Sequence, residues 1–167
     1  PQAEEVQKWE QYLNRQGLRE ELVSRYIFEH LFIGDIYFSD LAGPVQFFKL
    51  VRSRTPPGQA IEVIATRRPY APPGAAAVFS RLQPPRPPAL ATRHMPYALD
   101  DARMDRWNAL FFDVDYDVSS APGYAADVAS NPFVAFRDLP VEARYKFMLD
   151  EAQFTIMGFI KGPVCRG

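Results

Sequence analysis

The chain has 167 residues, of which 47% are hydrophobic and 14% aromatic, and its formal net charge is -1. This composition supplies enough apolar side chains for one folded domain and excludes wholesale disorder. The lack of net positive charge and of a recognition motif argues against nucleic-acid binding. No apolar run reaches the roughly 20 residues that a membrane-spanning helix needs.

Cys165 is the only cysteine, so the chain holds no internal disulfide and no Cys-x-x-Cys-His motif for covalent haem attachment. The chain begins at Pro1, without an initiator Met or a signal peptide, and it stops two residues after Cys165. We expect it to be an internal piece of a longer protein.

Residues 1–40 predict a helical section. Three residues recur at helical spacing: Val6, Trp9 and Leu13. Gly17 is a plausible stop, and a second helix is expected over residues 19–38. Its apolar surface is broad, which indicates burial on more than one side.

Residues 45–93 predict strands separated by proline-rich turns. The strand candidates are residues 45–51, 60–65, 76–82 and 89–92. Their connections are too short for parallel crossovers, so we expect a small antiparallel meander. Between Lys49 and Arg93 there are eight basic residues and one acidic residue, a net charge of +7. The flanking sections hold 11 basic and 19 acidic residues, a net charge of -8.

Residues 99–161 return to helical patterns. Asp100 or Asp101 can cap a helix, and a loop then leads to Asn131-Pro132. The last helix is expected from Val141 to Lys161, where Gly162-Pro163 ends it.

Together these sections predict an α+β fold in a single domain or domain fragment. A small antiparallel sheet, at about residues 45–93, would pack against helices from residues 1–40 and 99–161.

The last helix sets three polar residues into an apolar sequence: Asp150, Glu151 and Gln153. If buried, they need partners. One interpretation is a proton-transfer or hydrolytic site, because burial raises carboxyl pKa values. The favoured one is a structural set of ion pairs that locks this helix onto the sheet. The cations for it would be Arg52, Arg54, Arg67 and Arg68, which are equally suited to phosphate.

Two histidines are present. His30 lies on an apolar helix, where a hydrogen-bonded core residue is the favoured interpretation over an acid, base or ligand. His94 stands beside Met95, and both are haem-ligand types, but the missing attachment motif favours a structural role.

Several strings resemble the bacterial fatty acid cis/trans isomerase family, in order along nearly the whole chain. They are residues 26–32, 48–58, 64–70, 94–100, 129–133 and 150–167. The last of these, Asp150-Glu-Ala-Gln-Phe-Thr-Ile-Met-Gly-Phe-Ile-Lys-Gly-Pro-Val-Cys-Arg-Gly167, is long enough to be specific.

The resemblance implies a periplasmic c-type haem protein that converts cis-unsaturated acyl chains of membrane phospholipids to trans under solvent or heat stress. It implies that haem iron transiently withdraws electron density from the double bond, with no diffusible redox cofactor. The family's Cys-x-x-Cys-His lies N-terminal to the portion present here, so we expect haem c in the parent protein and none attached to this chain, which would be inactive alone.

The resemblance also implies roles for the candidates above. Possible haem ligands are His30, His94 and Met95. The haem or acyl pocket would be lined by Asp150, Glu151 and Gln153, and anionic lipid headgroups would bind Arg52, Arg54, Arg67 and Arg68. The expected partners are membrane phospholipid acyl chains and the rest of the parent chain. The alternative is a non-catalytic module that docks lipid or a partner.

Overall fold

The computed structural model describes residues 1–86 and 95–160, with side chains described as far as Gln153. The elements follow in chain order: α1 (Gln2–Leu13), α2 (Leu18–Leu31), β1 (Asp35–Phe38), β2 (Lys49–Ser53), β3 (Phe79–Gln83), β4 (Pro96–Leu99), α3 (Asp101–Phe111), α4 (Ala126–Ala129), α5 (Pro132–Ala135) and α6 (Val141–Ile160). The predicted α+β class is confirmed.

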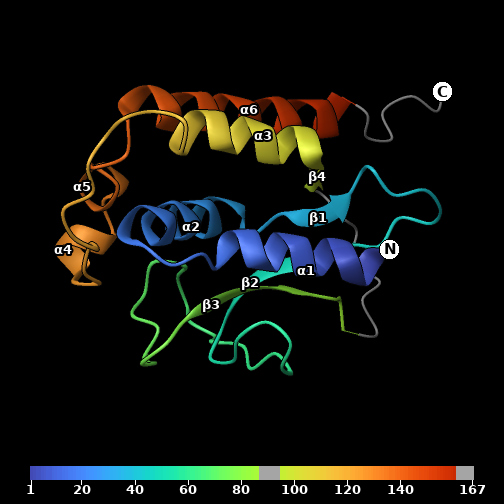
Figure 1. Cartoon of the computed structure of the whole chain (residues 1–167), viewed down its shortest axis with the longest axis horizontal. Helices are drawn as coiled ribbons and strands as arrows, with labels where there is room; N and C mark the ends of the chain where they lie inside the picture. The colour runs from blue at the N-terminus through green and yellow to red at the C-terminus, as the bar shows by residue number, and fades with distance from the viewer. Residues whose placement is uncertain (87–94, 161–167) are drawn as a thin grey trace.

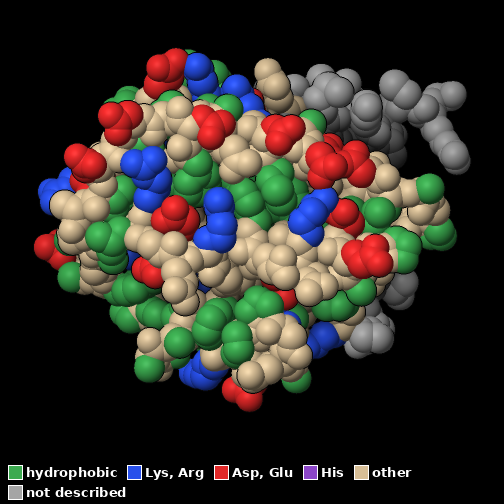
Figure 2. Space-filling model, in the orientation of Figure 1, with side chains coloured by type: hydrophobic (Ala, Val, Ile, Leu, Met, Phe, Trp, Pro, Cys, Tyr) green, Lys and Arg blue, Asp and Glu red, His purple; other side chains and the backbone are tan. Residues whose placement is uncertain are grey.

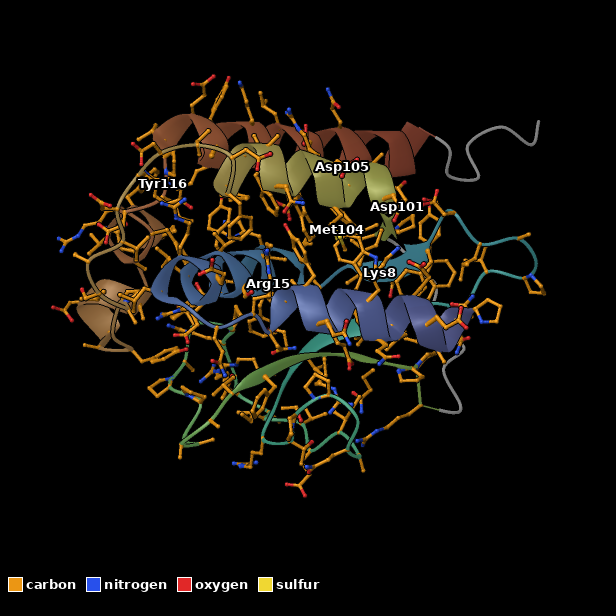
Figure 3. The ribbon with its side chains drawn as sticks, in the orientation of Figure 1. Lys8, Arg15, Asp101, Met104, Asp105 and Tyr116 are labelled. Carbon is orange, nitrogen blue, oxygen red and sulfur yellow. The ribbon has the colours of Figure 1, made fainter. Side chains whose placement is uncertain are left out.

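The helices and strands are stacked in layers. Figure 1 shows α3 and α6 side by side on one side of the protein, β2 and β3 on the other, and α1, α2 and β1 between them. Lys8 of α1 binds the carboxylate of Asp101 at the start of α3, with 2.7 Å between Nζ and Oδ1 (Figure 3). Because the layers follow in this order, the last helix, α6, lies away from the β2–β3 pair.

Four strands form two pairs rather than one meander. β2 and β3 are antiparallel, from Lys49 opposite Gln83 to Ser53 opposite Phe79, as predicted for this section. β1 and β4 are parallel, which the prediction missed. A parallel pair needs a long crossover, and here the whole segment between β1 and β4, including β2 and β3, supplies it.

Other strand predictions fared less well. Residues 60–65 contribute only a single bridge, between Val63 and Ser53. The predicted strand at 89–92 lies outside the described residues. A second isolated bridge, between Ile36 and Phe48, links β1 to the segment that enters β2.

The second helix ends earlier than predicted. α2 stops at Leu31, and the chain turns at Gly34, whose N–H donates to the carbonyl of Leu31 at 2.9 Å. A Cβ at Gly34 would lie 3.2 Å from that carbonyl oxygen, so glycine suits the turn. Beyond it, Ile36 and Phe38 are buried at alternate positions, as a strand requires.

Helix ends in the third section follow their capping residues. The carboxylate of Asp100 accepts from the N–H of Arg103 at 2.7 Å, which confirms the predicted cap of α3. The predicted loop contains the short helix α4, and a second short helix, α5, begins where the loop was expected to end, with Asn131 as its cap. α6 begins at Val141 as predicted, while Lys161 and the Gly162-Pro163 stop lie outside the described residues.

The core is rich in aromatic rings. Trp9 and Trp107 meet edge to face with ring centroids 5.4 Å apart, and both are almost fully buried. Phe147 of α6 packs on Tyr26 of α2, with ring centroids 5.1 Å apart. This cluster joins the α3–α6 layer to α2 and thereby fixes the surroundings of His30.

Within the part of the chain that the structure describes, no helix is long and apolar enough to cross a lipid bilayer.

Candidate functional site

His30 lies in the last turn of α2, with its ring stacked on Tyr26 at a centroid distance of 4.1 Å. Its Nδ1 is 2.7 Å from the carbonyl oxygen of Tyr26. Because a carbonyl oxygen only accepts hydrogen bonds, Nδ1 carries the proton and the lone pair of the neutral ring lies on Nε2. Burial lowers the pKa of His30, although the hydrogen bond to Tyr26 opposes this in part. The imidazole is therefore neutral at pH 7.

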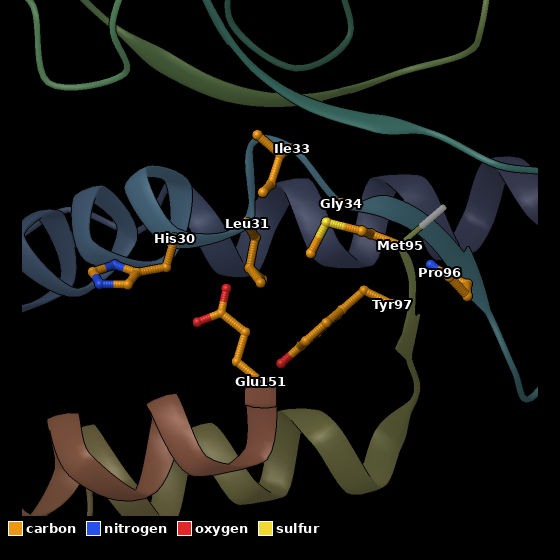
Figure 4. A pocket seen from close by; sticks show the side chains of 8 residues that line it. All are labelled: His30, Leu31, Ile33, Gly34, Met95, Pro96, Tyr97 and Glu151. Atoms are coloured by element: carbon orange, nitrogen blue, oxygen red, sulfur yellow. The ribbon is translucent and has the colours of Figure 1, made fainter. Parts of the chain in front are cut away.

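Glu151 reaches the same place from α6. Figure 4 shows its carboxylate between the ring of His30 and the hydroxyl of Tyr97. Burial raises the pKa of Glu151 to about 7. A carboxyl group poised near neutrality can take up or release a proton at physiological pH.

These side chains line a small pocket. Its lining consists of His30, Leu31, Ile33, Gly34, Met95, Pro96, Tyr97 and Glu151. The cavity volume of about 20 Å³ has room for one water molecule. The fold thus brings together three sequence candidates from distant parts of the chain: His30, Met95 and Glu151. They surround a space with room for one water molecule.

The other two polar residues of α6 lie elsewhere. The carboxylate of Asp150 binds Arg106 of α3, with 3.1 Å to Nε, and lies 3.8 Å from Nη1 of Arg103. The predicted pairing of Asp150 with the sheet arginines is wrong, because α2 and β1 lie between α6 and the β2–β3 pair. Gln153 is exposed and lines neither this pocket nor the larger groove. His94 lies outside the described residues.

A larger groove opens on the opposite side of α2. It runs between the α1–α2 turn, α2, the start of β3 and the loop at residues 121–124, and its volume is about 500 Å³. Small-molecule sites typically span about 300–1,000 Å³. Its apolar wall includes Leu13, Leu22, Phe28, Val78 and Phe79, and its charged residues are Arg15, Glu21, Arg25, Glu29 and Arg52. The groove therefore combines an apolar wall with three arginines.

Arg25 holds one side of this groove in place. Its Nε binds the carboxylate of Glu29 at 3.0 Å, and its Nη1 donates to the carbonyl of Pro122 at 2.8 Å. The guanidinium also lies 3.9 Å from the ring centroid of Tyr124. These contacts hold the loop at residues 121–124 against α2, where the loop forms one wall of the groove.

Of the four arginines predicted to bind lipid or phosphate, only Arg52 lines the groove. Arg54 and Arg67 are exposed, and Arg68 donates to the hydroxyl of Tyr70 at 2.9 Å. Figure 2 shows basic side chains interspersed with acidic ones on the face that it displays, so that face offers no extended basic surface. The groove arginines Arg15 and Arg25 were missed by the sequence analysis, although the i,i+4 pair of Arg25 and Glu29 was a local signal.

The described residues do not fit a haem. The pocket at His30 admits one water molecule, and the groove that has more room is lined by no histidine, methionine or cysteine. Among the residues that the structure describes, no group of three or more His, Cys, Asp or Glu side chains could hold a metal ion. Among the described residues, the side chains that could bind haem iron and the space that a haem would need are therefore found in different cavities.

Comparison with known proteins gives one match. The family model described as fatty acid cis/trans isomerase (CTI) matches residues 1–167, the full length of the chain. No curated protein and no solved structure matches the chain.

Proposed function

This chain belongs to the fatty acid cis/trans isomerase family, and from that membership we propose that it forms part of a haem-dependent enzyme that converts cis-unsaturated acyl chains of membrane phospholipids to trans. Family membership itself indicates isomerisation of fatty acids. The haem dependence, the phospholipid substrate and a periplasmic location extend that indication.

The observation that carries the proposal is the match over all 167 residues, and the groove supports it. Of the two cavities described above, the groove has the volume for an acyl chain, while the pocket at His30 has room for only one water molecule. Leu22, Phe28 and Phe79 offer an apolar wall that would shield the chain from water.

The haem is proposed to lie outside the described residues, in the remainder of the parent protein, attached through Cys-x-x-Cys-His. Neither of the two cavities fits a haem. The contribution of this chain is to bind the acyl chain and hold it apart from water.

A second candidate is a lipid-docking module without catalytic residues of its own. The groove is lined by no histidine, methionine or cysteine that could bind haem iron. This favours the second candidate, because lipid binding would need only the groove. The two candidates differ in whether loss of the groove changes turnover at saturating lipid or only affinity.

The test uses the full-length, haem-loaded protein and vesicles of cis-unsaturated phospholipid, with trans acyl chains measured by gas chromatography. Val78→Trp would fill the groove and should reduce conversion at least about tenfold, a loss of roughly 1.4 kcal/mol in transition-state stabilisation. Val134→Trp is the control, because Val134 and Val78 have the same exposed fraction of 38% and Val134 is outside the groove.

No conversion by the wild-type protein would refute the proposed activity. Equal conversion by the two tryptophan variants would refute the groove as the acyl site.

A further inference from the structure

Arg52 is a buried cation whose charge is poorly matched by its surroundings. It comes from β2, is 5% exposed and lines the groove. Its Nη1 donates to the carbonyl of Ala71 at 3.0 Å, and its Nη2 donates to the hydroxyl of Thr66 at 2.8 Å. Both acceptors are neutral. Its buried Nε has no hydrogen-bond partner among the described residues.

The carboxylate that interacts with Arg52 is already engaged. Burial lowers the pKa of Arg52, whereas Tyr124 and, to a smaller extent, Glu29 raise it, but the carboxylate of Glu29 binds Nε of Arg25 at 3.0 Å. Arg52 therefore forms no ion pair of its own with the residues that the structure describes. Over the whole groove, three arginines and two glutamates leave one positive charge.

Arg81, on the neighbouring strand, shows how this fold satisfies a buried guanidinium. It is 6% exposed, close to the value for Arg52, and its acceptors include a carboxylate. They are Glu10 Oε2 at 2.9 Å, Thr55 O at 3.2 Å, Pro56 O at 2.8 Å and Gln59 O at 2.9 Å. A buried charge without such a counter-ion is costly unless a bound anion supplies one.

We propose that Arg52 anchors the oxyanion head group of an acyl amphiphile whose tail lies along Leu22, Phe28 and Phe79. A carboxylate or a phosphodiester, each carrying one negative charge, would balance the single positive charge of the groove. The ring of Phe28 lies 5.3 Å from the guanidinium, so the apolar wall begins beside the charge. Arg52 would thus set which end of the acyl chain enters first. This inference rests on the proposed function, because that function places the acyl chain in the groove.

The test is calorimetric titration of the purified full-length protein, below the critical micelle concentration, with three probes. These are cis-9-hexadecenoate, its uncharged methyl ester, and a lysophosphatidylglycerol with the same acyl chain. The wild-type protein should bind the carboxylate at least about tenfold more tightly than the ester, a difference of roughly 1.4 kcal/mol. Tighter binding of the lysolipid than of the fatty acid would also support the anchor. It would show that the anion bound by Arg52 is the phosphodiester of a lipid head group.

Variants separate Arg52 from general charge effects. Arg52→Gln should reduce the affinity for the carboxylate to that for the ester, and Arg52→Lys, which keeps the charge but loses the planar fork, should fall between them. Arg54→Gln is the matched control, because Arg54 is exposed and lies outside the groove, and it should keep the wild-type preference. If Arg52→Gln fails to fold, the wild-type comparison of acid with ester still decides.

Equal affinities for acid and ester in the wild-type protein would overturn the anchor, as would loss of the preference in Arg54→Gln. The binding assay needs no turnover, so the two proposals can fail separately. A protein that prefers the acid but forms no trans product refutes the isomerase activity, and one that forms trans product without the preference refutes the anchor.

Discussion

The carboxylate of Glu10 binds the guanidinium of Arg81 inside the protein, with 2.9 Å between Oε2 and Nε. Its other oxygen, Oε1, accepts from the N–H of Leu82 at 2.9 Å, so this one side chain fastens α1 to β3 twice. Both partners are buried, and each guanidinium nitrogen and each carboxylate oxygen takes part in at least one hydrogen bond. This ion pair therefore ties α1 to β3 and, through β3, to β2.

Removing the negative charge of this pair should destabilise the fold. Glu10→Gln leaves the buried guanidinium of Arg81 without its counter-ion, which typically costs about 3–5 kcal/mol of unfolding free energy. Urea unfolding followed by the fluorescence of Trp9 and Trp107, both buried, would measure the loss. The control is Glu4→Gln, because the Glu4 side chain is 86% exposed, and it should leave the midpoint unchanged. A midpoint shift no larger for Glu10→Gln than for this control would contradict the prediction.

The carboxyl group of Glu151 should make stability depend on pH near neutrality. Its pKa is raised from 4.5 to about 7 by burial, so the folded protein binds more protons than the unfolded chain between these values. The contribution of Glu151 to the stability of the fold is then complete below about pH 4.5 and is lost as the pH rises through about 7. Glu151→Gln should flatten this part of the profile of melting temperature against pH and raise the melting temperature at pH 8.

A second glutamate with a raised pKa makes a control necessary. Burial also raises the pKa of Glu29, so only the difference between Glu151→Gln and wild type reports on Glu151. Glu142→Gln, on the same helix, should keep the wild-type slope, because Lys146 lowers the pKa of Glu142 below this window. Parallel profiles for wild type and Glu151→Gln would show that Glu151 does not titrate as expected.

Phe147 should be the side chain of α6 on which the layer packing depends most. It is 1% exposed and contacts four rings: Tyr26, His30, Trp107 and Phe111. Phe147→Ala should cost about 3–5 kcal/mol of unfolding free energy, because it removes these contacts and leaves a cavity. Met148→Ala is the neighbouring control, since Met148 is 54% exposed. The idea fails if chemical denaturation gives the two variants the same stability.

Gly17 should tolerate no side chain without strain. It precedes α2 with a φ of 126°, a region that residues with a Cβ rarely adopt, and an added Cβ would collide with the carboxylate of Glu20. Gly17→Ala should therefore lower the unfolding free energy by about 1–3 kcal/mol. Gly123→Ala is the control, because φ at Gly123 is not positive and its nearest neighbour would be 3.9 Å away. Calorimetric melting of both variants would check this, and equal melting temperatures would rule it out.

Local patterns were sufficient for most of the helices but not for the strand pairing. The spacing of Val6, Trp9 and Leu13 predicted α1, and Asp100 predicted the start of α3. The sequence at residues 35–38 was assigned to a helix, because Ile36 and Phe38 fit either period over so short a run. Their strand conformation depends on a partner, β4, that lies far along the chain, and no local pattern reveals it.

The candidate site shows the same division. His30 and Glu151 were singled out by residue type, but their common pocket depends on the packing of α6 over α2 through Phe147 and Tyr26. The predicted partners of Asp150 were wrong because the order of the layers is not encoded in the spacing of charges. Arg52 was chosen for its charge, whereas its burial in the groove follows from its position on β2.

The parallel pairing of β1 with β4 also bears on synthesis of the protein. β1 leaves the ribosome well before β4, and until β4 follows it, the edge of β1 that β4 covers stays unpaired. The β2–β3 hairpin, built from neighbouring segments, can form during that interval. A nascent chain halted before Leu99 would therefore hold paired β2 and β3 strands beside an open edge of β1, and such an edge can pair with a strand of another chain.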